Sequence, residues 1–430
     1  MLYSLYEMSH WSVGPMRLAA QLQTMALRSP LNPIKESEVS RTMAAASDLF
    51  EAVTRRYAKP GWRLHETTVQ GVRVPVRPVR VWGGQWCQLI HFERDEAALR
   101  KARGGRADPS VLIVAPLSGH YATLLRGTVE TFLPDYEVYI TDWADARMAP
   151  IVAGRFDLND YIDHIIDMLH TLGPDMHVVA VCQPGPAVLA AVSLMAAAGD
   201  VCAPATMTFM GSPIDARRSP TAPNKLAEGR PFDWFVKNMI HTVPMPYPGA
   251  FRRVYPGFLQ LASFMGMNWT RHVDAHYDFY KHLIEGDGDS AERHREFYDE
   301  YLSVLDLTEE FYLQTIQDVF QEYKIARGVF RHDGELVRPE AIEHTALMTV
   351  EGEKDDISGI GQTQAAHDLC QNIPHAMQLD YVQPGVGHYG VFNGRRFQTE
   401  IYPRMREFHL AFQRPAARGL APRRKRITVQ

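Results

Sequence analysis

The sequence VVAVCQPGPAVLAAVSLMAAA, residues 178–198, is the most informative part of this chain. It reads as a short apolar strand, a sharp turn centred on Cys182, and a helix rich in alanine, leucine and valine. Such a turn holds one side chain out of the sheet at the positive end of a helix, where a thiolate is stabilised. The stretch is long enough to suggest a membrane span, but Pro184, Gly185 and Pro186 interrupt it near its start. We therefore predict strand, elbow and helix, with Cys182 as the candidate nucleophile.

The residues that flank this elbow are unusual. Strand and helix backbones approach closely there, so small residues are needed two positions before and two positions after the nucleophile. Ala180 is small, and Pro184 lacks an N–H that the first helical turn would leave unpaired in any case. We expect these two residues to allow the close packing that glycines normally allow. The alternative is an inert, buried cysteine that acts only as a small hydrophobic residue.

The chain around this stretch alternates strands with helices, which is typical of a parallel sheet covered by helices. The segment DLNDYIDHIIDMLHTLG, residues 157–173, predicts a helix with Asp157 as its cap and Gly173 at its end. The predicted buried strands are 111–115, 137–141, the strand before Cys182, 205–210, 347–351 and 377–382. This pattern predicts an α/β-hydrolase fold, a mostly parallel sheet with helices on both faces and an inserted helical cap.

The remaining segments do not alternate strands with helices in this way. Together with the sheet region, they divide the chain into four predicted parts. Leu18, Leu22 and Met25 follow a helical period near the start, and we expect these helices to pack on the core. Aromatic residues, methionine and proline crowd the interval after the fourth predicted strand, which predicts an apolar cap over the carboxyl edge of the sheet. The predicted parts are an N-terminal helical extension (1–60), the hydrolase core (61–211 and 331–412), the cap (212–330) and a basic tail expected to be disordered (413–430).

Composition narrows the class of protein. The chain has 430 residues and a net charge of −5, whereas a nucleic-acid-binding protein would carry a basic excess. Only the last residues are strongly basic, and that tail is either solvated or attracted to an anionic surface. Four cysteines form neither a disulfide framework nor a zinc motif, so we expect no metal and a reducing compartment. The first residues do not read as a secretory signal, which favours a cytoplasmic location.

A nucleophile of this kind needs a base and an orienting acid. In this fold the order along the chain is nucleophile, acid, histidine. Asp355 and Asp356 follow the predicted strand 347–351, and His388 follows the last strand in a glycine-flanked loop. We prefer Asp355, which is nearer the strand end, while Asp356 is suited to cap the next segment. The alternative is that Asp355 is a turn residue and His388 a surface histidine.

The oxyanion hole is expected to use two backbone N–H groups. One belongs to the residue after the nucleophile, Gln183, and the other to the loop after strand 111–115, where we choose Ser118. His120 is close to that loop in sequence. It could contact substrate, although a histidine that caps a turn is the simpler interpretation.

Several long motifs also resemble a known family. MLYSLYEM at the start, AVCQPG at the elbow, DLTEEFYLQTIQDVFQEY, EGEKDDISGIGQT and PGVGHYGVFNGRRF are similar to the intracellular polyhydroxyalkanoate depolymerases of the short-chain poly(3-hydroxybutyrate) type. The resemblance covers nearly the whole chain and weakens in the basic tail. It implies an α/β-hydrolase with a cysteine nucleophile that degrades the amorphous polyester of cytoplasmic storage granules. By resemblance, the nucleophile is Cys182, the acid Asp355 and the base His388.

Some alternatives stay open at this stage. Water would release 3-hydroxybutyrate or oligomers from the acyl-enzyme, whereas coenzyme A would give the acyl-CoA as a co-substrate, and no other cofactor is expected. A polyhydroxyalkanoate synthase uses the same residue types but normally keeps both box glycines, which are Ala180 and Pro184 here. A non-catalytic granule-coating protein is a third interpretation, although it would not need Cys182, Asp355 and His388. The expected partner is the granule surface, and a homodimer is neither predicted nor excluded.

Overall fold

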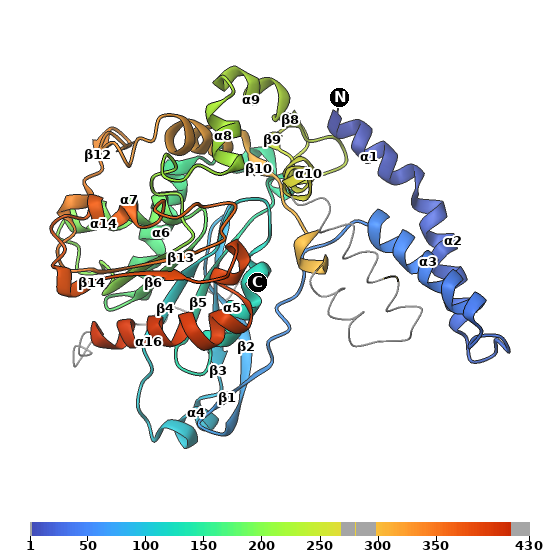
Figure 1. Ribbon diagram of the computed structural model, residues 1–430, viewed down its shortest axis with the longest axis horizontal. Helices are drawn as coiled ribbons and strands as arrows, with labels where there is room; N and C mark the ends of the chain where they lie inside the picture. Colours follow the sequence, from blue (N-terminus) through green and yellow to red (C-terminus); the bar gives the residue numbers. More distant parts are fainter. Residues whose placement is uncertain (1, 268–279, 281–297, 414–430) are drawn as a thin grey trace.

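The computed structural model of the protein describes residues 2–267, 280 and 298–413. At its centre is a nine-stranded sheet with the strand order β1-β2-β3-β5-β4-β6-β7-β13-β14 (Figure 1). The strands from β5 to β14 are parallel, and β1 to β3 are antiparallel at one edge. The strands are β1 (Glu66–Val69), β2 (Val72–Gly83), β3 (Cys87–Arg94), β4 (Ser110–Val114), β5 (Glu137–Trp143), β6 (His177–Val181), β7 (Thr206–Met210), β13 (Ala346–Gly352) and β14 (Gln378–Gln383).

Helices cover both faces of this sheet, which confirms the predicted α/β-hydrolase fold. Successive residues of a strand point to opposite faces, so Val178 and Ala180 join one apolar core while Val179 and Val181 join the other. Each face is covered by a pair of helices. These are α6 (Leu158–Leu172) and α7 (Gly185–Ala197) on the first face, and α5 (Arg126–Phe132) and α16 (Tyr402–Ala411) on the second.

Helix α6 begins and ends where the sequence predicts. The Asp157 side chain accepts the N–H groups of Asn159 and Asp160, and the Asp160 side chain in turn accepts the N–H of Asp157. Gly173 ends the helix with a φ of 85°, a conformation that favours glycine. The capping signals in the sequence were therefore sufficient to locate this helix.

The position of the functional crevice follows from the strand order. From β4 the chain passes to β5 on one side, and β6 then returns to the other side of β4. The loops that follow β4 and β6 therefore diverge, and a crevice opens between them at the carboxyl edge of the sheet. Ser118 lies in the first loop, and Cys182 and Gln183 lie in the second.

A second layer covers this edge, built from residues between β7 and β13. It contains a small antiparallel sheet and several short helices. Part of the predicted cap, 268–279 and 281–297, lies outside the described residues. The described elements are α8 (Ala222–Glu228), α9 (Phe232–Asn238), β8 (His241–Thr242), β9 (Arg253–Tyr255), α10 (Gly257–Met267), β10 (Leu307–Thr308) and α13 (Glu309–Thr315).

The N-terminal helices form an arm rather than a layer on the core, as Figure 1 shows in blue. Leu18, Leu22 and Met25 are 57%, 58% and 70% exposed, so the prediction that these helices pack on the core is wrong for residues 14–28. The reason is that α2 and α3 pack on each other, with small residues such as Ala20 and Ala44 buried. The first helix, residues 2–12, does contact the main core, through the buried Tyr3. The arm comprises α1 (Leu2–Ser12), α2 (Gly14–Arg28) and α3 (Glu38–Thr54).

Two further predictions concern the basic C-terminal tail and the apolar stretch that is long enough to suggest a membrane span. Residues 414–430 of the predicted basic tail lie outside the described residues. Among the helices that the structure describes, none combines the length and apolar character that a membrane crossing requires. The apolar stretch at 178–198 is instead divided between β6, the elbow and α7.

Candidate active site

Cys182 occupies the turn between β6 and α7 in a strained backbone conformation. Its φ is +67°, in the left-handed region that non-glycine residues rarely adopt. The Cys182 N–H donates to the carbonyl oxygen of Met210 at 2.8 Å, which ties the turn to the neighbouring strand β7. Pro184 directly precedes α7, as the sequence predicts. A strained residue at the tip of a strand is how this fold presents a nucleophile.

The close packing at this elbow depends on a glycine that the sequence pattern did not single out. Ala180 is fully buried in the apolar core on one face of the sheet, where its small side chain is accommodated. A Cβ atom at Gly185 would lie only 2.6 Å from Ser212 Oγ, at the start of the segment after β7. In this chain the position at the elbow that requires glycine is therefore residue 185, one residue after Pro184.

His388 and Asp355 form a buried pair beside the elbow. His388 Nδ1 lies 2.8 Å from Asp355 Oδ2, and the two side chains are 4% and 0% exposed. Asp355 Oδ1 accepts the N–H groups of Ile357 and Ser358 at 2.9 and 2.8 Å. Both carboxylate oxygens are thus engaged, and the imidazole is held in one orientation. Asp356, the alternative acid, is exposed.

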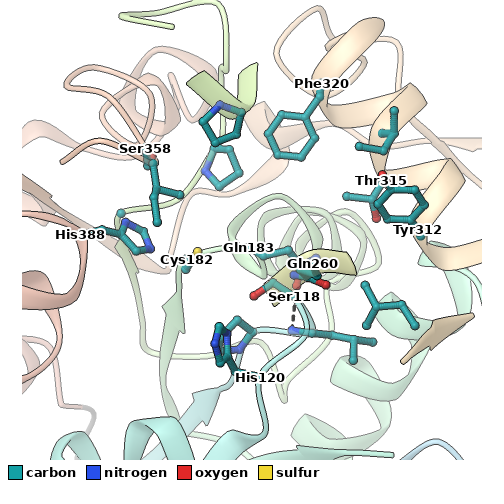
Figure 2. A pocket seen from close by; sticks show the side chains of 18 of the residues that line it. Ser118, His120, Cys182, Gln183, Gln260, Tyr312, Thr315, Phe320, Ser358 and His388 are labelled. Carbon is teal, nitrogen blue, oxygen red and sulfur yellow. Dashed lines mark hydrogen bonds between the residues drawn. The ribbon is translucent and has the colours of Figure 1, made fainter. Parts of the chain in front are cut away.

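The charge state of His388 depends on its two neighbours. Burial alone would lower the pKa of His388, but the nearby Cys182 sulfur and the Asp355 carboxylate raise the pKa well above its usual value of 6.5. Figure 2 shows the Cys182 sulfur and the His388 ring side by side. The structure thus brings Cys182, His388 and Asp355 together, with the His388 ring between the other two side chains.

The loops after β4 and β6 are joined through the side chain of Gln183. Gln183 Oε1 accepts the N–H of Leu117 at 3.1 Å. The backbone N–H groups of Ser118 and Gln183 have no acceptor within the described part of the chain. Both N–H groups therefore remain available for a ligand oxygen next to Cys182. The sequence suggested these two N–H groups but not the bridging role of the Gln183 side chain.

A cavity of about 190 Å³ opens above Cys182. This is smaller than the ~300–1,000 Å³ of sites for drug-sized ligands, so the cavity suits a short segment of substrate. Its lining is mostly apolar, and the cap contributes much of it. The lining includes Leu124, Phe392 and His388 from the core and Tyr255, Leu307, Phe311, Tyr312, Ile316 and Phe320 from the cap.

Some polar residues in this cavity were not identified from the sequence. Gln260 of α10 and Ser358 are 9% and 3% exposed, and Gln260 Oε1 and Ser358 Oγ lack a hydrogen-bond partner among the described residues. Both line the cavity (Figure 2). Gln260 lies outside the quoted motifs, and Ser358 lies within EGEKDDISGIGQT, where no local pattern distinguishes it from its neighbours. His120 also lines the cavity, and its Nε2 lies 3.0 Å from the carbonyl oxygen of Tyr301.

His120 is unsuited to proton transfer. Burial lowers the pKa of His120 to about 4, so the imidazole is neutral near pH 7. The suggestion that His120 caps a turn is incomplete, because its ring holds a residue of the cap segment 298–305. Elsewhere in the described chain, Asp163, His332 and Asp333 lie close enough together to bind a metal ion. None of these three residues lines the cavity.

One known protein family matches the C-terminal part of the chain. Residues 211–413 match the family described as PHB de-polymerase C-terminus. The match covers just under half of the chain and includes Asp355 and His388 but not Cys182. This part of the protein is therefore PHB depolymerase-like, as the sequence motifs suggested. Among curated proteins there is no significant match.

Several solved structures are distantly similar. A 2-hydroxy-6-oxo-6-phenylhexa-2,4-dienoate hydrolase from Rhodococcus sp. strain RHA1 is 11% identical, with 79% of this chain and 99% of that chain covered and a TM-score of 0.40. A thermophilic esterase from Thermogutta terrifontis is 11% identical, with coverage of 80% and 98% and a TM-score of 0.38. A monoacylglycerol lipase from Paleococcus ferrophilus is 13% identical, with coverage of 71% and 96% and a TM-score of 0.38. These similarities are too distant to indicate what this chain acts on.

Proposed function

We propose that this protein cleaves the ester bonds of a short-chain polyester, poly(3-hydroxybutyrate), through an acyl-enzyme on Cys182. The observation that carries the proposal is the strained elbow of Cys182, which presents the thiol to an apolar cavity beside the buried His388–Asp355 pair. The match of residues 211–413 to PHB de-polymerase C-terminus supports the choice of polyester. In this proposal His388 is the acid and base, and Asp355 orients it.

The first half of the reaction forms a thioester. His388 holds the proton of the Cys182 thiol, and the sulfur attacks the ester carbonyl carbon. The negative charge that develops on the carbonyl oxygen is stabilised by the N–H groups of Gln183 and Ser118. The C–O bond of the ester then breaks, His388 protonates the departing alkoxide, and one polymer chain leaves with a hydroxyl end. The acyl part stays on Cys182.

The second half releases the acyl group. His388 takes a proton from water, the resulting hydroxide attacks the thioester carbonyl, and the Cys182 thiol forms again. The products are 3-hydroxybutyrate or its oligomers. Coenzyme A in place of water would give the acyl-CoA by the same steps.

The cavity supports a substrate that is apolar but rich in carbonyl groups. Methyl and methylene groups of the polyester can contact the apolar lining, which includes Tyr312 and Phe320. The amide of Gln260 and the hydroxyl of Ser358 lack full hydrogen-bonding partners and can serve the ester oxygens of neighbouring repeat units. On this proposal the protein acts at the surface of cytoplasmic polyester granules.

The proposal is tested with purified protein and native amorphous polyester granules, with and without coenzyme A. We expect soluble 3-hydroxybutyrate or short oligomers to appear, and none in a Cys182→Ala variant. Cys202→Ala is the matched control, because this second half-buried cysteine lies outside the cavity lining. Acyl-CoA that forms only when coenzyme A is added would identify thiolysis as the release step.

Three outcomes contradict the proposal. Product release that persists in Cys182→Ala would remove the cysteine as nucleophile. Polymer growth from 3-hydroxybutyryl-CoA would instead identify a synthase. Binding to granules without any product, in protein that is folded by circular dichroism, would indicate a coat protein.

A further inference from the structure

Tyr3 of the arm is buried far from its neighbours in sequence. Its side chain is 1% exposed, although Leu5 and Met8 of the same helix are 54% and 67% exposed. The Tyr3 hydroxyl donates to Asp306 Oδ2 at 2.6 Å, and Asp306 is 2% exposed. The arm therefore joins the main body through a short, buried hydrogen bond to a carboxyl group, whose pKa is raised to about 7 by burial and by the nearby Asp145.

Asp306 connects this hydrogen bond to the cap and the core. Its Oδ1 accepts the N–H of Gly257 at 2.9 Å, at the start of α10. Its own N–H donates to Asp145 Oδ1 at 3.1 Å. Helix α10 carries Gln260 into the cavity, where a Cβ on Gly119 would lie 2.5 Å from the Gln260 amide. The Asp306 carboxyl group thus joins Tyr3 to the start of α10, and the backbone of Asp306 continues the segment that precedes β10.

The segment before β10 holds the loop after β4. Leu305 N–H donates to the Gly119 carbonyl oxygen at 2.7 Å, and His120 forms a β-bridge with Val304. The His120 ring also contacts the Tyr301 carbonyl oxygen, as described above. The two residues that follow Ser118 are therefore held by residues just before Asp306, and Ser118 supplies one of the two proposed oxyanion donors.

We infer that Tyr3 is a positioning residue, which holds the Ser118 N–H in place for the ester oxyanion through its hydrogen bond to Asp306. This inference rests on the proposed function. Removal of the hydroxyl leaves Asp306 Oδ2 buried without its hydrogen-bond donor, so the segment that holds Gly119 and His120 loses part of its support. The geometry of an oxyanion donor is sensitive to small displacements.

The test compares Tyr3→Phe with Tyr6→Phe. Tyr6 lies on the same helix and stacks on Phe258 at 4.0 Å, and its hydroxyl has no hydrogen-bond partner among the described residues. Two reactions are measured on each variant: turnover of the soluble ester p-nitrophenyl butyrate, and alkylation of Cys182 by iodoacetamide. Alkylation needs the reactive thiolate but forms no oxyanion, so it separates loss of Ser118 positioning from general damage to the site.

We expect Tyr3→Phe to lower kcat roughly tenfold. KM and the alkylation rate should stay within about twofold of the wild type, and Tyr6→Phe should match the wild type in all three quantities. Unchanged ester turnover in Tyr3→Phe overturns the inference. So does a parallel fall in turnover and alkylation, or a failure to fold, because Tyr3 would then be merely structural. A wild-type protein that hydrolyses no ester overturns the proposed function first, and this inference with it.

Discussion

Gln183 Oε1 accepts the N–H of Leu117 at 3.1 Å, so the residue after the candidate nucleophile holds the opposite wall of the crevice. Leu117 is 5% exposed, so its buried N–H depends on this acceptor. The side chain of Gln183 therefore holds the loop that contains Ser118, while its backbone N–H is the proposed oxyanion donor.

Gln183→Met should separate these two tasks. Methionine has a similar length but no amide oxygen, so the buried Leu117 N–H loses its acceptor while the backbone N–H of residue 183 is retained. We expect the free energy of unfolding to fall by about 1–3 kcal/mol. The kcat for soluble esters should fall roughly tenfold through displacement of the loop. Urea unfolding and steady-state kinetics measure the two effects, and a fully active, fully stable variant would contradict this account.

Asp355→Asn should disable catalysis without loss of the fold. An amide can still accept the N–H groups of Ile357 and Ser358, but it no longer stabilises the His388 imidazolium. We expect kcat to fall roughly 10²- to 10⁴-fold. Asp356→Asn is the matched control, because this neighbouring carboxylate is exposed, and it should leave kcat unchanged. If Asp356→Asn lowered kcat and Asp355→Asn did not, Asp356 would be the carboxylate that orients His388.

The strain at Cys182 predicts an unusual order of stabilities. At most positions alanine is more stable than glycine, but residue 182 has a φ of +67°. We therefore expect Cys182→Gly to be more stable than Cys182→Ala by about 1 kcal/mol. Urea unfolding of the two inactive variants measures this difference directly. The opposite order would mean that the elbow relaxes once the thiol is removed.

Gly185→Ala should disturb the packing behind the elbow. The new methyl group would lie 2.6 Å from Ser212 Oγ, and α7 would have to move away from the strand end. We expect a loss of about 1–3 kcal/mol in the free energy of unfolding. Gly266→Ala is the control, since a Cβ at that position in α10 meets no atom of the described residues within 4 Å. That variant should be more stable, by about 0.5–1 kcal/mol.

Two buried histidines predict how stability depends on pH. The rings of His177 and His409 stack with their centroids 4.7 Å apart. Burial lowers the pKa of His177 to about 4 and that of His409 well below 6.5. Below pH 6.5 the unfolded chain binds protons that the folded chain rejects, so stability should fall as the pH drops from about 6.5 toward 4. The limiting slope is about 1.4 kcal/mol per pH unit for each histidine.

His409→Gln should reduce this slope, because it removes one titrating group. Glutamine can still form hydrogen bonds with Tyr136 and Thr208, the partners of the His409 ring. Urea unfolding at several pH values measures the slope. Replacement of the exposed His65 by glutamine is the control and should leave the slope unchanged. An unaltered slope in His409→Gln would assign the acid sensitivity to other groups.

Much of the fold could be predicted because its signals are local. The apolar strands and the capped helix α6 depend on residues within one element, and periodicity and capping show them directly. The structure places Cys182, Asp355 and His388 together, as their order along the chain suggested. Each follows a strand of one parallel sheet, so the topology alone brings them to the same edge.

The remaining features depend on contacts between distant residues. The same helical period at Leu18 and Leu22 would describe a helix packed on the core or one in an exposed arm, and only the tertiary structure distinguishes these cases. The bridge from Gln183 to Leu117 and the close approach of Gly185 to Ser212 have no periodic signal. The opening segment MLYSLYEM contributed to the family resemblance, but nothing in its composition indicated that Tyr3 reaches Asp306.

The hydrogen bond between Tyr3 and Asp306 also imposes an order of events during synthesis. It joins residues 303 positions apart, so the arm leaves the ribosome long before its partner. At about 5–20 residues per second, Tyr3 waits roughly 15–60 s for Asp306 to be translated. The contact between Tyr3 and Asp306 can therefore form only after strands β1 to β7 have been translated. A nascent chain that stops before residue 306 can already contain the cysteine elbow, yet it cannot make this contact.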